Sequence, residues 1–185
     1  MQTDIIISGF GGQGVLFAGQ LLAYTALENE LFVTWIPSYG PEMRGGTAHC
    51  TVIISDDEIG SPLIRNPRAA VAMNLPSLDK YEDVVLPGGV MVVNDSLIER
   101  EVKRKDIDVI RVPANGIAEE LGNIRLANMV ILGALVTYLK VFSLESLGES
   151  LKLHLPERHQ HLVGKNLEAM RRGAAIAEEF ARTTA

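Results

Sequence analysis

Short runs of apolar residues, most of them rich in β-branched side chains, recur along the chain between polar, glycine- or proline-containing segments. Runs of this length and composition are typical of buried strands. They predict strands at residues 5–7, 32–36, 49–54, 69–73, 90–94 and 109–112, with residues 59–62 pairing back as a short hairpin arm. Pro37 should end the second strand, because proline has no N–H to donate to a neighbouring strand.

Apolar residues spaced three and four positions apart lie between these strands and predict helices. Helices are expected at 15–28 and 76–83, and the pattern stays helical from residue 115 onward, with an apolar stretch at 126–142 that should be buried. No repeat or linker interrupts the alternation of strands and helices. It predicts a single α/β domain of Rossmann-like type over residues 1–185, with a mostly parallel sheet covered by helices on both faces.

Composition and charge narrow the classes of function. The formal net charge of −6 disfavours a nucleic-acid surface, which would carry clustered basic residues. The first residues lack the basic segment of a secretory signal. The stretch 126–142 contains Asn128 and Lys140 and is shorter than the ~20 residues that span a bilayer. We therefore expect a cytoplasmic protein without membrane contact.

Cysteine and histidine are sparse. The single cysteine, Cys50, excludes an internal disulfide and an iron–sulfur cluster held by this chain alone, and it is expected to be buried and unreactive. His154, His159 and His161 lie close together in the sequence. No matching cluster of carboxylates or cysteines accompanies them, so we expect no metal site.

A glycine-rich turn joins the first strand to the first helix. The pattern G-x-G-x-x-G falls at Gly9, Gly11 and Gly14, with Gly12 and Gln13 between the last two. Glycines there let backbone N–H groups approach an anion at the positive end of the helix. The same glycines would also serve a tight turn without a ligand, and both interpretations stay open. A nicotinamide dinucleotide is disfavoured, because residues 34–38 offer no acidic side chain for the ribose.

A second loop, residues 37–46, is rich in glycine and proline and carries the polar side chains of Ser38, Tyr39, Glu42 and Arg44. An arginine on such a loop can hold a carboxylate or a phosphate through two parallel hydrogen bonds. Alternatively, Arg44 pairs with Glu42 or with a neighbouring backbone carbonyl. Both roles are compatible with the sequence.

The two loops together resemble the gamma subunit family of 2-oxoacid:ferredoxin oxidoreductases. Members of that family combine a G-x-G-G-Q-G turn with an S-x-G-P-E-x-R-G-G loop, and both stand intact here at residues 9–14 and 38–46. The resemblance covers nearly the whole chain, with further agreement at residues 66–67, 86–89, 128 and 132–135.

This resemblance implies a subunit of an enzyme that oxidatively decarboxylates a 2-oxoacid with coenzyme A, giving an acyl-CoA, carbon dioxide and reduced ferredoxin. Thiamine diphosphate and Mg²⁺ would lie between alpha and beta subunits, and iron–sulfur clusters on beta-type or ferredoxin-like chains. This chain would hold no catalytic residue, metal or cofactor alone, but would shape a hetero-oligomer, with gamma–gamma contacts as a further expectation. It would contact coenzyme A through its two loops, at Gly9, Gly11, Gly12, Gln13, Gly14, Ser38, Tyr39, Glu42 and Arg44.

The expected substrate is 2-oxoglutarate, because a separate gamma chain of this size with the loop S-Y-G-P-E-M-R-G-G is similar to that branch of the family. Pyruvate, branched-chain 2-oxoacids and indolepyruvate stay open. Two other classes of protein also remain. One is a self-contained NAD(P)-dependent reductase, and the other is a nucleotide-binding regulatory module that would bind phosphate without an obligate partner.

Overall fold

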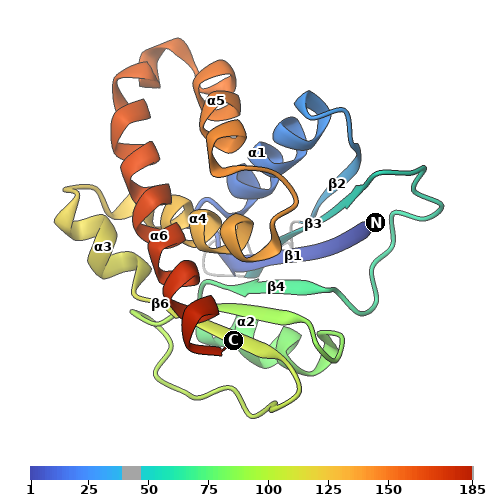
Figure 1. Ribbon diagram of the computed structural model, residues 1–185. Coiled ribbons are helices and arrows are strands. Elements are labelled where there is room, and N and C mark those ends of the chain that lie inside the picture. Colours follow the sequence, from blue (N-terminus) through green and yellow to red (C-terminus); the bar gives the residue numbers. More distant parts are fainter. Residues whose placement is uncertain (39–46, 185) are drawn as a thin grey trace.

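The fold comes from a computed structural model that describes residues 1–38 and 47–184. Strands form one sheet in the order β2-β3-β1-β4-β5-β6 (Figure 1). Strands β1, β4, β5 and β6 are parallel, while β3 lies antiparallel between β1 and β2. The predicted mostly parallel sheet is therefore confirmed. The strands are β1 (Gln2–Phe10), β2 (Phe32–Ser38), β3 (Thr47–Ser55), β4 (Ala69–Ala72), β5 (Val90–Asn94) and β6 (Asp108–Val112).

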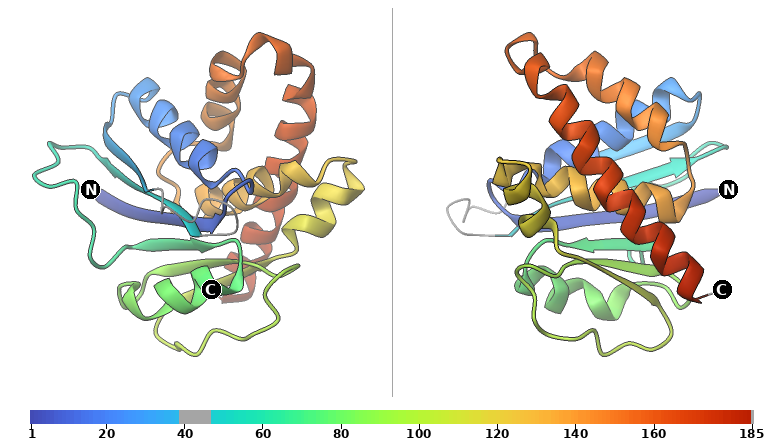
Figure 2. Two further views of the ribbon diagram at one scale, coloured as in Figure 1. Left: turned by 180° about the vertical axis from the view of Figure 1, so that it is seen from behind. Right: turned by 60° about the vertical axis from the view of Figure 1, so that its left-hand side comes forward.

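Helices cover both faces of this sheet, as expected. Figure 2 shows α2 on the opposite side of the sheet from α1, α4 and α6. The side chains of β1 alternate accordingly: Ile5 and Ile7 pack with the residues of α1 and α4, and Ile6 packs with Leu78 of α2. The helices are α1 (Val15–Glu28), α2 (Leu75–Tyr81), η1 (Glu82–Val84), α3 (Ala114–Glu120), η2 (Ile124–Leu126), α4 (Ala127–Leu139), α5 (Leu144–His154), η3 (Glu157–Leu162) and α6 (Val163–Thr184).

Helix α4 occupies the apolar stretch that was expected to be a core helix. All its residues from Ala127 to Val136 are buried. It crosses α6 at two glycines: a Cβ on Gly133 would overlap the backbone of Met170, and a Cβ on Gly173 would overlap the carbonyl of Val130. The two backbones therefore touch. Within the described ranges, no helix combines the length and apolar character that a membrane crossing requires.

Two predicted details of the strands are wrong. Strand β2 continues through Pro37, which pairs with Cys50 of β3. Proline is tolerated there because β2 is an edge strand, so the missing N–H can face away from the sheet. Residues 59–62 form no strand. They have no edge to pair with, because β3 is already paired with β1 on one side and β2 on the other.

The sheet has a topological switch point between β1 and β4. These strands are parallel neighbours, but the chain leaves β1 for α1 on one face and leaves β4 for α2 on the other. The two connections diverge at the carboxyl ends of the strands. In open α/β sheets the crevice at such a point is where ligands bind.

Candidate functional site

The glycine-rich turn lies at this switch point. Strand β1 ends at Phe10, and α1 begins at Val15 with Gly14 as its N-terminal cap. Gly12 and Gly14 have φ angles of 97° and 74°, in the left-handed region that favours glycine. No side chain caps α1, and its first turn has no acidic residue. Its positive end is thus available to an anion.

Gln13 fixes the shape of this turn. Its Oε1 accepts hydrogen bonds from the Phe10 N–H at 2.6 Å and from Asn74 Nδ2 at 3.3 Å, and its Nε2 donates to the Met73 carbonyl at 3.3 Å. A Cβ on Gly9 would come within 2.6 Å of Gln13 Oε1, so only glycine leaves room for this arrangement. The Gln13 amide is therefore engaged within the chain, and it joins the loop after β1 to the loop after β4.

A chain of buried amides continues from Gln13 along the carboxyl ends of the strands. Asn74 caps α2 by accepting from the Ser77 N–H at 3.0 Å. Asn94, at the end of β5, donates to the Met73 carbonyl at 3.3 Å and to Asn115 Oδ1 at 2.9 Å. From the sequence, Asn94 is expected to cap the segment that follows β5, with a polar contact to a substrate as the alternative; its bonds to Met73 and Asn115, each 21 positions away, have no local signal in the sequence. These amides hold the crevice in one shape.

A groove of about 380 Å³ opens beside the glycine-rich turn. The beginnings of α1 and α4 meet there, and Asn128 of α4 donates to the Gly14 carbonyl at 3.2 Å. Neither helix has a side-chain cap or an acidic residue in its first turn. The groove is lined by Gly12, Gly14, Phe17, Asn123, Arg125, Leu126, Asn128, Leu155, Pro156, His159, Leu162 and Asn166.

The lining of this groove favours an anionic group attached to an apolar or extended arm. It includes Arg125 and His159 but no Asp or Glu. The uncapped N-terminus of α1 adds partial positive charge. Apolar side chains such as Phe17 and Leu162 form the rest of the wall. Sequence reasoning missed this lining, because its residues come from four separate parts of the chain.

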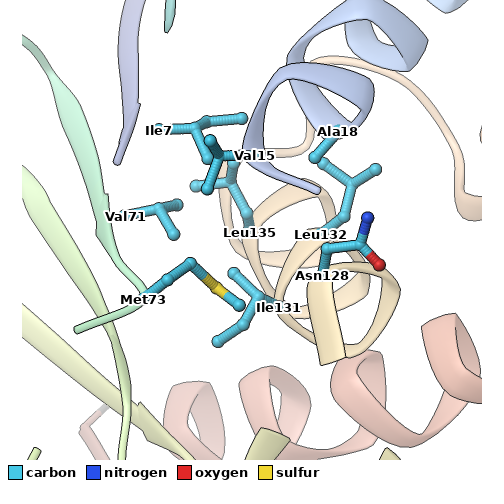
Figure 3. A pocket seen from close by; sticks show the side chains of 9 residues that line it. All are labelled: Ile7, Val15, Ala18, Val71, Met73, Asn128, Ile131, Leu132 and Leu135. Carbon is cyan, nitrogen blue, oxygen red and sulfur yellow. The ribbon is translucent and has the colours of Figure 1, made fainter. Parts of the chain in front are cut away.

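A second, much smaller cavity lies directly behind the turn. Its volume is about 10 Å³, at the lower limit for one water molecule. Figure 3 shows apolar side chains of β1, β4, α1 and α4 around it, with the polar end of Asn128 turned away from the others. We interpret this cavity as a packing gap in the core and not as a site.

Of the second predicted loop, the structure describes only Pro37 and Ser38. Ser38 ends β2 and pairs with His49 of β3. Tyr39, Glu42 and Arg44 lie outside the described residues. His49 also pairs with Ser8, and its ring lies 5.9 Å from that of Tyr81 in α2. Burial, together with the charge of Lys80, lowers the pKa of His49 below its ordinary value. Sequence reasoning did not identify His49 as a neighbour of the switch point.

Cys50 is buried in β3, as expected, with its Sγ 3.5 Å from the Val15 carbonyl. Burial raises the pKa of this thiol to about 12, although the neighbouring Trp35 and Gly19 act in the opposite direction. A thiol with such a pKa stays protonated at neutral pH, so it is a poor nucleophile and a poor metal ligand.

The topology weighs against a nicotinamide dinucleotide. In the dinucleotide fold, the acidic residue for the ribose ends the strand adjacent to the first strand. Here β1 has two neighbours: β3 runs in the opposite direction, and β4 runs parallel but is followed by Met73 and Asn74, neither of which is acidic. The end of β2 at Ser38 lies two strand spacings from β1, about 10 Å away.

Comparison with known proteins defines the class. The sequence pattern of the family described as pyruvate ferredoxin/flavodoxin oxidoreductase matches residues 4–176. The chain therefore belongs to this family, which confirms the resemblance seen in the two loops.

Individual relatives narrow the class further. The chain is 38% identical over 186 residues to the 2-oxoglutarate synthase subunit KorC of Methanothermobacter marburgensis, covering 97% of this chain and 98% of that one. It is 37% identical over 179 residues to the ketoisovalerate oxidoreductase subunit VorA of Methanothermobacter thermautotrophicus, covering 96% of this chain but only 37% of the relative. The chain thus spans little more than a third of the length of VorA.

A solved structure agrees with the sequence relatives. The gamma subunit of a keto/oxoacid ferredoxin oxidoreductase from Geobacter sulfurreducens superimposes with a TM-score of 0.81 at 30% sequence identity. The match covers 96% of this chain and 99% of that chain.

Proposed function

We propose that the chain is the gamma subunit of a 2-oxoacid:ferredoxin oxidoreductase that acts on 2-oxoglutarate. The reaction would convert 2-oxoglutarate and coenzyme A to succinyl-CoA and carbon dioxide, with the released electrons passing to ferredoxin. The main support is the end-to-end match with a 2-oxoglutarate synthase subunit of nearly the same length. The ketoisovalerate relative carries the matching region within a much longer chain.

The chemistry of this reaction would take place on partner subunits. An iron–sulfur cluster needs several cysteine thiolates, and this chain has one cysteine, whose thiol is buried with a pKa of about 12. Thiamine diphosphate would supply carbanion stabilisation, held with Mg²⁺ between the alpha and beta subunits. The gamma chain would contribute shape and electrostatics at the edge of the active site.

Coenzyme A is the ligand that we propose for this chain. Its phosphates and extended arm match the positive, partly apolar groove beside the glycine-rich turn. Backbone N–H groups at Gly9, Gly11, Gly12 and Gly14 and the guanidinium of Arg125 would face a phosphate, and Gln13 would keep the turn in shape. Ser38, Tyr39, Glu42 and Arg44 of the second loop are the further residues that we propose for the contact with coenzyme A.

Partner subunits would dock on the carboxyl end of the sheet. Three large apolar side chains are exposed where strands end: Phe10 after β1 at 37%, Leu75 after β4 at 40% and Leu97 after β5 at 47%. Contiguous exposed apolar surface is typical of protein interfaces, and we propose that these three side chains belong to one. Alpha and beta subunits and a ferredoxin-like chain are the partners we propose.

A panel of 2-oxoacids tests the substrate. The native complex would be purified through a tag on this chain and assayed with a ferredoxin or viologen acceptor and coenzyme A. We expect the highest kcat/KM with 2-oxoglutarate. A preference for 2-oxoisovalerate, pyruvate or indolepyruvate would move the chain to another branch of the same family.

A further inference from the structure

Strand β2 forms one edge of the sheet, and among the described residues no strand pairs with its outer side (Figure 1). Proteins ordinarily protect such an edge with charged side chains, because it offers a row of backbone groups to any other strand. Neither β2 nor its neighbour β3 contains Asp, Glu, Lys or Arg, although 22% of the chain is charged. This edge has no charged side chain to oppose pairing.

Pro37 determines which backbone groups of β2 face outward. A proline within a strand is tolerated where its nitrogen faces away from the neighbouring strand. Backbone groups alternate sides along a strand, so Val33 and Trp35 turn their N–H and C=O groups outward together with Pro37. Thr34 and Ile36 then bond to β3. The outward row consists of the N–H and C=O groups of Val33 and Trp35 and the carbonyl of Pro37.

We infer that the outer edge of β2 pairs antiparallel with β2 of a second copy of this chain, about a two-fold axis at Trp35. In this register the Trp35 N–H of each copy donates to the Trp35 carbonyl of the other. The Val33 N–H donates to the Pro37 carbonyl of the other copy. The missing N–H of Pro37 falls at the outer limit of the ladder, where its loss disturbs least. Such self-complementarity is what a two-fold contact requires.

The side chains of the uncovered face support a second copy as the occupant. Val33 and Trp35 pack toward α1, so Phe32 and Ile36 point to the other face, where they are 48% and 39% exposed. In the two-fold register, Ile36 is a diagonal neighbour of both Ile36 and Phe32 of the other copy, within reach of large side chains. Pairing therefore joins four exposed apolar side chains into one row across the axis.

Charge also favours the antiparallel arrangement. The chain carries a net charge of −6, so two copies repel unless they meet at a neutral surface. Glu30 precedes β2, and the two-fold axis places the two Glu30 side chains at opposite ends of the paired strands, ~30 Å apart at the usual rise per residue. This separation is well beyond the screening length of about 8 Å at physiological ionic strength.

Amide hydrogen exchange of the full-length chain tests the pairing residue by residue. In the dimer, the outward amides of Val33 and Trp35 should exchange as slowly as the inward amides of Thr34 and Ile36. A monomer would show the alternating pattern of an edge strand, with Val33 and Trp35 exchanging quickly. The pairing of two β2 strands does not depend on the reaction that the complex catalyses. Absence of this pairing would therefore not contradict the proposed function.

Analytical ultracentrifugation with two variants at position 33 provides a second test. Val33→Pro removes an outward N–H and leaves the bonds to β3, and we expect it to sediment as a monomer with an unchanged circular dichroism spectrum. Val33→Ala removes the same side chain but keeps the N–H, and it should remain dimeric. If Val33→Pro does not fold, the amide exchange of Val33 and Trp35 in the wild-type protein still distinguishes a paired edge from a free one.

Three results would overturn the inference. One is a wild-type chain that sediments as a monomer throughout the micromolar range. Another is a dimer in which the Val33 and Trp35 amides exchange quickly, which would place the contact elsewhere. The third is slow exchange of these amides only after partner subunits bind, which would show that the edge takes a strand of a different chain.

Discussion

At the scale of single residues, Gln13 shows how a motif can be structural and still serve a ligand. Its amide closes the turn through the Phe10 N–H, Asn74 and the Met73 carbonyl. Gln13→Ala should lower the free energy of unfolding by about 1–3 kcal/mol, because the Phe10 N–H and the part-buried Asn74 amide lose their acceptor and the Met73 carbonyl keeps only Asn94 as a donor. Urea unfolding measures this. Gln2→Ala, on an exposed side chain bonded to Asp4, is the control and should change little. An equal loss of unfolding free energy in both variants would contradict the role of Gln13 in closing the turn.

Arg44 carries the proposed contact of the second loop with coenzyme A. Arg44→Ala should weaken the use of coenzyme A by about 1.5–3 kcal/mol, the usual contribution of a hydrogen bond to a charged group. The apparent KM for coenzyme A should rise, while the half-reaction with thiamine diphosphate and 2-oxoacid alone stays unchanged. Arg44→Lys should rescue only in part, because an ammonium lacks the planar fork. A well-assembled Arg44→Ala complex with unchanged coenzyme A kinetics would rule out this contact.

Glu82 makes the stability of the chain depend on pH. Burial alone would raise its pKa, but hydrogen bonds from the Arg100 side chain and the Lys103 and Arg104 N–H groups bring the pKa below its ordinary value. A carboxyl with a lowered pKa in the folded state stabilises the fold above its unfolded pKa, and this contribution is lost as pH falls through the folded value.

Thermal unfolding of Glu82→Gln measures this contribution. At neutral pH the variant should melt below the wild-type protein, and the difference should shrink as the pH falls below the ordinary pKa of a glutamate. Asp57→Asn, at an exposed turn, is a control that should show no such convergence. A constant difference between Glu82→Gln and wild type at all pH values would contradict the expectation.

At the scale of elements, the crossing of α4 and α6 depends on glycine. Gly173→Ala places a methyl group on the Val130 carbonyl. Overpacking of this kind costs about 1–3 kcal/mol, and we expect a loss at the upper end because backbone must move. Gly164→Ala, in the same helix but with open space around its Cβ, should be neutral or stabilising. Denaturant unfolding of the two variants compares them, and a similar loss in both would contradict the close crossing.

Local patterns predicted most of the elements, because each strand and helix has its own periodicity. The predicted range of α1 matches the structure, and the parallel strands from β4 to β6 lie within short apolar runs. The direction of β3 could not be predicted, since it depends on pairing with residues of β1 that lie 37 to 53 positions earlier in the chain. The continuation of β2 through Pro37 could not be predicted either, because it is possible only in a strand at the edge of the sheet.

For the whole molecule, the sequence predicted the turn that forms the site but not the site's surroundings. The glycines of the turn follow a local rule for strand-to-helix connections. The groove beside it brings Gly12, Arg125 and His159 together only after α4 and α6 have packed on the sheet. Asn94 and Asn115 meet for the same reason. Contacts between distant segments leave no periodic trace in the sequence.

The isolated chain should not bind a nicotinamide dinucleotide. Of the two strands beside β1, β3 runs in the wrong direction to present a ribose-binding acid and β4 ends without one, and residues 34–38 also have none. Fluorescence titration with NADH at near-physiological salt should show no saturable binding in the micromolar range. Micromolar affinity for NADH would instead support a self-contained NAD(P)-dependent reductase.

As the proposed gamma subunit, this chain is expected to be a part of an enzyme and to have no turnover of its own. Subunit omission tests it most directly. Alpha, beta and ferredoxin-like subunits would be prepared with and without this chain, and 2-oxoglutarate- and coenzyme A-dependent viologen reduction would be measured. We predict no activity from this chain alone, low activity without it, and full activity when it is added back. Equal activity with and without the chain, or turnover by the chain alone, would contradict the claim.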